Sequence, residues 1–141
     1  MTGSVHPEPP HRRVDPPSLP PPKGYSNGVL AAPGRTLYLA GQVGWDRDER
    51  FPEGLPAQVD LALRNLVAVL ATAGGRPEHL VSMRIYTRSV EAWRAQRKAI
   101  GEVWRTHLGR WYPAMTLVEV PRLYDAPALV EIESIAVLPP G

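Results

Sequence analysis

Hydrophobic residues recur along this chain with two different periods, which separate the expected strands from the expected helices. Alternating or continuous apolar runs rich in β-branched residues predict strands at residues 29–32, 36–43, 80–88, 114–120 and 129–138. Two stretches between them instead have apolar residues at helical spacing. The first stripe comprises Val59, Leu63, Leu66 and Leu70, and the second comprises Trp93, Ile100, Val103, Trp104 and Leu108.

Residues that start and stop helices support the same division. Pro56 suits the first turn of a helix, and Gly74 and Gly75 end it. Ser89 is a suitable N-cap for a second helix, which Gly109 ends. The predicted order is β-β-α-β-α-β-β, which indicates an α/β domain with a mixed sheet.

The last two strands are apolar on both faces, and this predicts an oligomer. Two helices can cover only one face of a small sheet, so the second face has to be buried in another way. The basic residues of the second helix, Arg94, Arg97, Lys98 and Arg105, fall largely outside its apolar stripe and are interpreted as a solvated face.

A change in composition separates the N-terminus from the rest of the 141-residue chain. Prolines crowd residues 1–24, where they fix φ and remove backbone donors. We therefore predict a disordered Pro-rich tail over residues 1–13, one domain over residues 14–138 and a short C-terminal tail over residues 139–141.

Composition narrows the range of functions. The chain has no cysteine, which excludes disulfides, thiol catalysis and thiolate metal sites. A formal net charge of +2 is not the basic footprint of a nucleic-acid binder. No apolar run is long enough for a membrane span, and no secretory signal is evident, so we expect a cytoplasmic protein.

Common catalytic and cofactor motifs give no further support. The four histidines have no metal-ligand spacing. We find no nucleophile elbow, phosphate-binding loop or dinucleotide fingerprint, and we expect neither a metal nor a cofactor.

One acidic residue stands out within an apolar strand. Glu131 lies in Ala128-Leu-Val-Glu-Ile-Glu-Ser-Ile-Ala-Val137, with Glu133 two residues later. A buried carboxylate is costly unless it is paired, hydrogen-bonded or protonated. Glu131 therefore needs a partner or a chemical task, whereas Glu119 and Glu133 are better explained by backbone or arginine partners.

Several segments together resemble the Rid family of reactive intermediate deaminases, also called YjgF-type proteins. The closing strand resembles the family's Val/Ile-Glu-Ile-Glu-Ala-Ile-Ala-Val signature. The preceding Pro113-Ala-Met-Thr-Leu-Val-Glu-Val120 resembles its Pro-Ala-Arg-Ser/Thr-x-Val-Glu-Val strand. Leu39-Ala-Gly-Gln-Val43 and Gly24-Tyr-Ser-Asn-Gly28 are similar to two further family segments. The resemblance covers roughly residues 14–138.

This resemblance implies a chorismate-mutase-like fold with two helices on one face of the sheet, assembled as a homotrimer with sites in clefts between subunits. It also implies hydrolysis of enamine or imine intermediates. By matching positions, Glu131 would position the attacking water, Tyr25 would line the cleft and Gly41 would contribute backbone groups. Met115 stands where the family has a carboxylate-binding arginine, and Leu117 replaces a small or thiol residue.

Methionine cannot form the paired charge-assisted bonds that a guanidinium makes to a carboxylate. Three outcomes remain open. Arg84 or Arg122 could take the place of the family's carboxylate-binding arginine, or the substrate could depend less on binding through a carboxylate. Alternatively, the site could be catalytically silent. Apolar walls would come from Met115, Leu117, Tyr86 and Trp45.

We therefore predict a deaminase of small imines or enamines. The alternatives are a non-catalytic trimer that binds a small ligand or a partner, and a specialised pathway enzyme that uses the same cleft.

Overall fold

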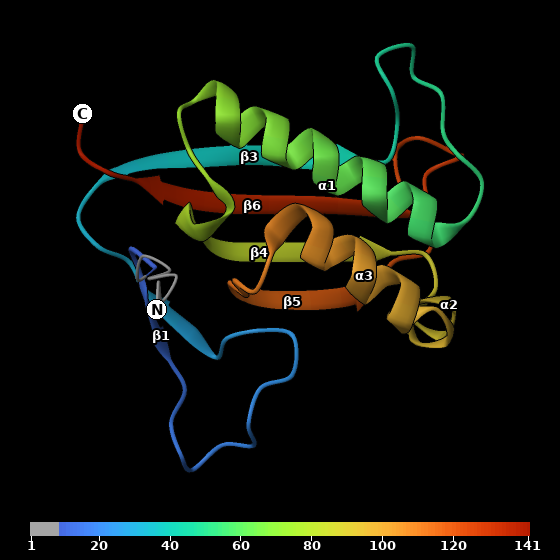
Figure 1. The fold of residues 1–141 in the computed structure, drawn as a ribbon. Coiled ribbons are helices and arrows are strands. Elements are labelled where there is room, and N and C mark those ends of the chain that lie inside the picture. The colour runs from blue at the N-terminus through green and yellow to red at the C-terminus, as the bar shows by residue number, and fades with distance from the viewer. Residues whose placement is uncertain (1–8) are drawn as a thin grey trace, which may run out of the picture.

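A computed structural model describes residues 9–141 of the chain as one α/β unit, with a four-stranded sheet and a separate two-stranded sheet (Figure 1). The strands are β1 (Arg12–Val14), β2 (Gly28–Leu30), β3 (Arg35–Val43), β4 (Leu80–Thr87), β5 (Ala114–Glu119) and β6 (Val130–Leu138). The helices are α1 (Leu55–Thr72), η1 (Pro77–His79, a 3₁₀ turn), α2 (Val90–Ala95) and α3 (Arg97–Leu108). No helix within the described residues combines the length and apolar character needed to cross a membrane.

The main sheet has the strand order β3-β6-β4-β5 and is mixed, as predicted. β4 and β5 are parallel neighbours joined through α2 and α3. β6 runs antiparallel to both β3 and β4 and lies between them. The crossover through α1 therefore does not give adjacent parallel strands, because the last strand of the chain inserts between the two that α1 connects.

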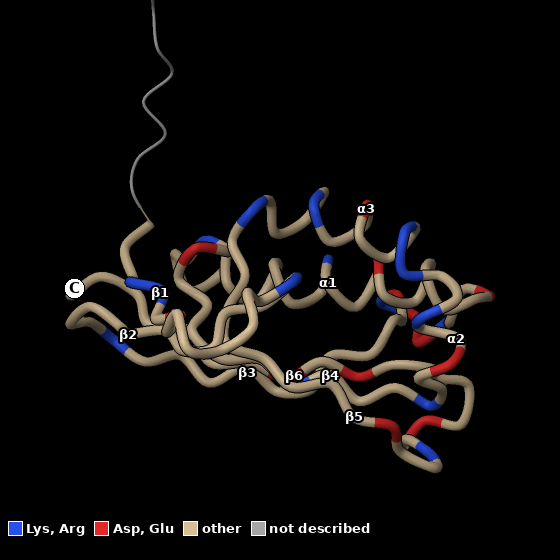
Figure 2. The backbone as a smooth tube through the Cα atoms, turned by 90° about the horizontal axis from the view of Figure 1, so that it is seen from below, with Lys and Arg blue, Asp and Glu red and all other residues tan. Residues whose placement is uncertain are grey.

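Helices α1 and α3 cover one face of this sheet, and Figure 2 shows both on the same side. The core between helices and sheet contains Val59, Leu63 and Leu66 from α1 and Ile85 and Ile132 from the strands, all at most 2 % exposed. The other face has no helix over it among the described residues, and it presents Tyr38 at 75 % and Val118 at 42 % exposure. The prediction of one covered face is thus confirmed, whereas the oligomer that it suggested stays a prediction.

The second predicted helix is divided in two. Ser89 caps α2 as predicted, because its hydroxyl accepts the Ala92 N–H. The helix then breaks at Gln96, whose φ and ψ are −114° and 16°, before α3 begins. Three helical segments instead of two, besides the 3₁₀ turn, therefore lie on this side of the sheet. No glycine or proline marks the break, so the residue pattern could not reveal it.

The N-terminal region also differs from the prediction. The first predicted strand, β2, does not join the main sheet but pairs with β1, an antiparallel partner that was not expected. His11 is only 4 % exposed: its Nε2 lies 2.9 Å from the Val137 carbonyl, and its Nδ1 accepts the Ala32 N–H. Residues 11–13 are therefore packed on the domain and are not part of a disordered tail. Residues 1–8 lie outside the described residues.

Candidate functional site

Strand register assigns the predicted site residues to opposite faces of the main sheet. Glu131 is opposite Tyr86, which is opposite Val118, so these three side chains share the open face. The next row, Ile132, Ile85 and Leu117, faces the helices. Met115 is two residues from Leu117 and lies on the same helix-covered side. Within one protomer, Glu131 and Met115 therefore do not face a common space.

Glu131 and Gly41 are brought together, as the resemblance implied. A Cβ atom placed on Gly41 would overlap the carboxylate of Glu131, so the glycine leaves room for that acidic group on β6. The Glu131 carboxylate has no hydrogen-bond or ion-pair partner within residues 9–141. Burial raises its pKa above the ordinary value, and the negative charges of Asp125 and Glu133 raise it further.

The neighbouring Glu133 is satisfied within the protomer. It accepts a hydrogen bond of 2.5 Å from the Tyr86 hydroxyl, and Arg84 Nη1 lies 3.8 Å from the same oxygen. The hydrogen bond to Glu133 is the main cause that raises the pKa of Tyr86. Glu133 has the arginine partner expected of it, and the one charged neighbour of Arg84 among the described residues is this carboxylate.

Glu119 is also structural, as predicted. Its Oε1 accepts the backbone N–H of Val90 at 3.0 Å, at the beginning of α2. A carboxylate at this place satisfies a donor that the helix itself leaves free.

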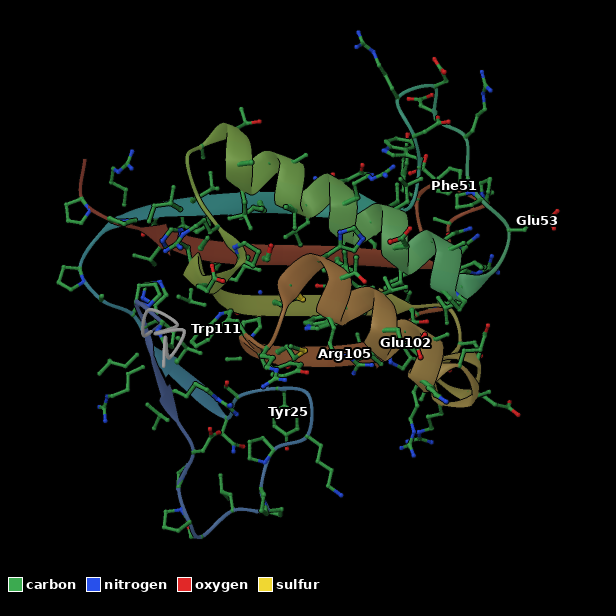
Figure 3. All side chains as sticks on the ribbon, viewed as in Figure 1. Tyr25, Phe51, Glu53, Glu102, Arg105 and Trp111 are labelled. Carbon is green, nitrogen blue, oxygen red and sulfur yellow. The ribbon has the colours of Figure 1, made fainter. Side chains whose placement is uncertain are left out.

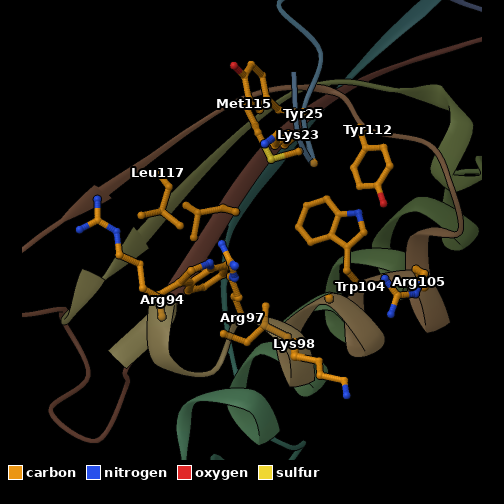
Figure 4. A pocket seen from close by; sticks show the side chains of 15 residues that line it. Lys23, Tyr25, Arg94, Arg97, Lys98, Trp104, Arg105, Tyr112, Met115 and Leu117 are labelled. Carbon is orange, nitrogen blue, oxygen red and sulfur yellow. The ribbon is translucent and has the colours of Figure 1, made fainter. Parts of the chain in front are cut away.

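A cavity of about 660 Å³ opens on the other side, between the edge strand β5 and helices α2 and α3 (Figure 4). It contains three of the predicted site residues: Tyr25, Met115 and Leu117. Aromatic side chains supply much of the remaining wall, and Trp104 and Tyr112 lie with their rings nearly parallel and their centroids 6.3 Å apart. The buried indole N–H of Trp104 has no acceptor among the described residues.

Five cationic residues line the same cavity, and the sequence interpretation missed their role. They are Lys23, Arg94, Arg97, Lys98 and Arg105. Four of them belong to the helical stretch that was interpreted as a solvated face. They are exposed, but they also surround the apolar opening. The signal that could have revealed this was the position of the basic face directly beside the Trp93 and Trp104 stripe.

The segment that carries Tyr25 is fixed against the start of β5. The Ser26 hydroxyl donates to the Tyr112 carbonyl at 2.5 Å, and the Ser26 N–H donates to the Pro113 carbonyl at 3.1 Å. Figure 3 shows Tyr25 below β5 in this view. A smaller cavity of about 300 Å³ lies here, and Tyr25, Met115 and Arg84 all contribute to its lining.

Two amides on α1 position the loops near Glu131. Gln58 is 3 % exposed; its side-chain NH₂ donates to the Pro52 and Pro127 carbonyls, and its carbonyl accepts the Leu129 N–H. Asn65 donates to the carbonyls of Val43 and Trp45. The buried Gln58 and the half-buried Asn65 thus connect α1 to these loops.

Trp45 and Tyr86 are not part of the wall around Met115. The Trp45 ring packs near Phe51, with centroids 5.8 Å apart, and Tyr86 shares the open face with Glu131. Neither residue lines the larger cavity. Within a single protomer, Met115 and Leu117 thus line the cavity, whereas Trp45 and Tyr86 lie elsewhere, and the substrate-binding role of all four stays a prediction.

Two histidines that the sequence separates by 68 positions lie near one another. The rings of His11 and His79 meet edge to face with centroids 6.4 Å apart. Both are buried, and the backbone engages both nitrogens of His11 and Nδ1 of His79. No group of three or more possible ligands suited to a metal ion occurs within residues 9–141. This pair is a packing feature of the N-terminal region.

Comparison with known proteins agrees with this architecture. The family model described as endoribonuclease L-PSP matches residues 17–138. The chain is 33 % identical to YyfB of Yersinia pestis, a Rid-family protein described as of unknown function. That similarity covers 92 % of this chain and 99 % of the other, with a TM-score of 0.82.

Two further structures are similar over most of their length. RidA from an Antarctic Psychrobacter is 29 % identical, with 82 % and 89 % of the two chains covered and a TM-score of 0.65. Rv2704 of Mycobacterium tuberculosis, from the YjgF/YER057c/UK114 family, is 32 % identical, with 82 % and 87 % covered and a TM-score of 0.62. No curated protein gave a significant match to the sequence.

Proposed function

Because the chain belongs to the YjgF/Rid family, we propose that it is a hydrolytic deaminase of small imine or enamine intermediates. The observation that carries the proposal is the Glu131 carboxylate, which lies over Gly41 in a partly buried setting without a protein partner within residues 9–141. A carboxylate that the fold partly desolvates but does not pair remains available to bind and deprotonate a water molecule.

The reaction balances without a cofactor. A water molecule adds to the carbon of the protonated C=N bond while Glu131 accepts one of its protons, which gives a neutral carbinolamine. Glu131 then returns that proton to nitrogen. As the C–N bond breaks and ammonia leaves, Glu131 accepts the hydroxyl proton, so that the carbonyl forms. The raised pKa of Glu131 suits this exchange, because a base whose pKa lies closer to the working pH also serves as an acid.

The proposed catalytic unit is a homotrimer. Glu131 faces away from the helices, whereas Tyr25, Met115 and Leu117 line the cavity on the helix-covered side. If the open face of one subunit packs against the β5 edge of the next, the carboxylate of the first can meet the cavity of the second. The exposed Tyr38 and Val118 on the open face support such an assembly, because exposed apolar sheet surface favours association.

Ammonia release provides the test. Imines are generated freshly by an amino-acid oxidase, and ammonia and 2-oxo acid are followed with and without the protein. We expect wild-type protein to accelerate hydrolysis and Glu131→Ala to remove about 10²–10⁴-fold of that acceleration, which is the range for a positioned acid–base group. Rates equal to buffer for every imine, or equal rates for wild type and Glu131→Ala, would contradict the proposal.

A non-catalytic binding protein is the second candidate, and Met115 is the observation that favours it. A methionine at this place offers a flexible apolar wall and no charge-assisted grip. A small molecule that raises the melting temperature but is never turned over would favour this candidate. The same cleft could also serve a specialised pathway enzyme, which turnover of a different C=N compound would reveal.

A further inference from the structure

The cavity beside β5 combines two properties that are usually separated on protein surfaces. Met115, Leu117 and Ile85 supply an aliphatic floor, and aromatic rings supply the sides. Cationic side chains stand around the opening, and no Asp or Glu from the described residues lines it. An apolar pocket with cations at its edge suits a ligand that has an apolar body and an anionic end.

The aromatic residues indicate the form of that body. Trp93, Trp104, Tyr25 and Tyr112 all line the cavity, and the Trp104 and Tyr112 rings are nearly parallel. Aromatic side chains favour offset-stacked or edge-on contacts with another flat ring. The cavity of about 660 Å³ is also larger than an alanine-sized substrate needs.

Arg94 and Arg97 are the cations best placed for the anionic end. Figure 4 shows Arg97 extending from the start of α3 toward the middle of the cavity, and Arg94 rising beside Leu117. Lys98, on the same helix, extends away from the cavity in this view. Neither arginine has an ion-pair partner within residues 9–141, so neither charge is neutralised inside the protomer.

We propose that this cavity selects aromatic 2-imino acids and related aryl anions, and that Arg94 and Arg97 on the helices hold the carboxylate that Met115 on β5 cannot hold. The inference rests on the proposed function for the reacting imine group, but the selection of an aryl anion is a binding property. It can therefore be measured without turnover.

Calorimetric titration with three probes tests the binding directly. Phenylpyruvate carries an aryl ring and a carboxylate, phenylacetone keeps the ring without the charge, and pyruvate keeps the charge without the ring. We expect phenylpyruvate to bind at least about tenfold more tightly than phenylacetone or pyruvate. Phenylacetone lacks the carboxylate that the arginines would bind, and pyruvate lacks the ring that the apolar wall would bury. Equal binding of phenylacetone or of pyruvate, or no binding of phenylpyruvate, would overturn the inference.

Charge-removing variants identify the groups involved. Replacing both arginines, as Arg94→Gln with Arg97→Gln, is expected to weaken phenylpyruvate at least about tenfold and to leave phenylacetone unchanged. The matched control is Arg110→Gln, which removes an exposed charge just beyond α3 that does not line the cavity and should change binding by less than about twofold. When Arg94→Gln is combined with Arg97→Lys instead of Arg97→Gln, part of the affinity for phenylpyruvate should return, because lysine keeps the positive charge. An equal loss in Arg110→Gln would show that only the general positive charge of this surface matters and would contradict the assignment.

Turnover separates this inference from the proposed function. Phenylpyruvate that binds through Arg94 and Arg97 to a protein without deaminase activity leaves the inference standing and removes the function. If the double arginine variant instead hydrolyses aromatic imino acids as fast as wild type does, the proposed function stands and the inference about Arg94 and Arg97 is overturned. The circular dichroism and melting temperature of each variant should match wild type, because both arginines are exposed.

Discussion

The carboxylate of Glu131 occupies the space that a side chain on Gly41 would fill. This relationship joins the C-terminal part of β3 to the beginning of β6, beside a break in their register between Leu39 and Gln42. It explains why a small residue is needed at position 41. It also means that a substitution at Gly41 can test where the Glu131 side chain lies.

Gly41→Ala should displace the Glu131 carboxylate and lower deaminase activity, with a loss of about 1–3 kcal/mol in the free energy of unfolding from overpacking. The background variant Glu131→Ala removes the overlapping group. In that background, adding Gly41→Ala should cost little stability, and urea unfolding of the four proteins of this cycle measures the difference. A stability loss of the same size in both backgrounds would show that Gly41 is required for another reason.

Glu131→Gln should change stability in a pH-dependent way. The pKa of Glu131 is raised by folding, so the folded protein binds more protons than the unfolded chain between the unfolded pKa and the raised one. Stability from this group is therefore present at low pH and lost as pH rises through that interval. The glutamine variant should be more stable than wild type at pH 7, with the advantage disappearing below about pH 4. Thermal melting across pH checks this, and a wild type that is the more stable protein at pH 7 would contradict it.

Tyr86→Phe should lower the free energy of unfolding by about 1 kcal/mol, because the Tyr86 hydroxyl donates to Glu133. Arg84→Ala should cost less, because its contact with Glu133 is 3.8 Å long and exposed. Tyr124→Phe is the matched control, since Tyr124 is 99 % exposed and its hydroxyl has no partner among the described residues. Denaturant unfolding ranks the three. A larger loss for Arg84→Ala than for Tyr86→Phe would mean that the ion pair dominates.

Met115→Arg should extend the substrate range. The new guanidinium would lie on the cavity floor and could bind a carboxylate without help from the helices. We expect hydrolysis of small aliphatic 2-imino acids to rise at least about tenfold, because one charge-assisted contact is added. If wild type already hydrolyses the small imino acids as fast as this variant, the methionine does not restrict the substrate.

Tyr38→Glu should dissociate the assembly. Light scattering on wild type should give about three times the chain mass of 15.5 kDa, because cyclic association buries the open face of every subunit. Tyr38 belongs to this face, whereas Tyr124, which is also exposed, lies in the loop between β5 and β6. Tyr124→Glu should therefore leave the mass unchanged. A monomeric wild type, or an unchanged mass in Tyr38→Glu, would contradict the proposed use of this face.

Much of the fold could be predicted from the residue pattern because local signals agreed with it. The apolar stripe at Val59 and Leu63, the cap at Ser89 and the alternation in β6 each mark one element, and the structure contains them all. The pattern could not show that β6 inserts between β3 and β4, because strand order depends on contacts that are distant in sequence. The packing of His11 beneath β6 was missed for the same reason.

The candidate site was only partly predictable. The resemblance located Glu131, Gly41, Tyr25 and Met115, but it did not show that Glu131 and Met115 face opposite sides of one sheet. The cationic edge was missed because each arginine, taken alone, fits an ordinary solvated helix face. Its meaning depends on the cavity beside it, which forms only when α2 and α3 pack over β5.

Subunit mixing is the measurement that tests the shared site most directly. Glu131→Ala lacks the proposed base, and Leu117→Arg obstructs the cavity, so each variant alone should be inactive. After both are unfolded and refolded together, random trimers should recover up to about a quarter of wild-type activity, because one site in four then receives an intact group from each neighbour. Recovery at that level is the result we predict. A mixture as inactive as its components, although both assemble as trimers, would contradict a site built from Glu131 of one subunit and the Met115 cavity of the next.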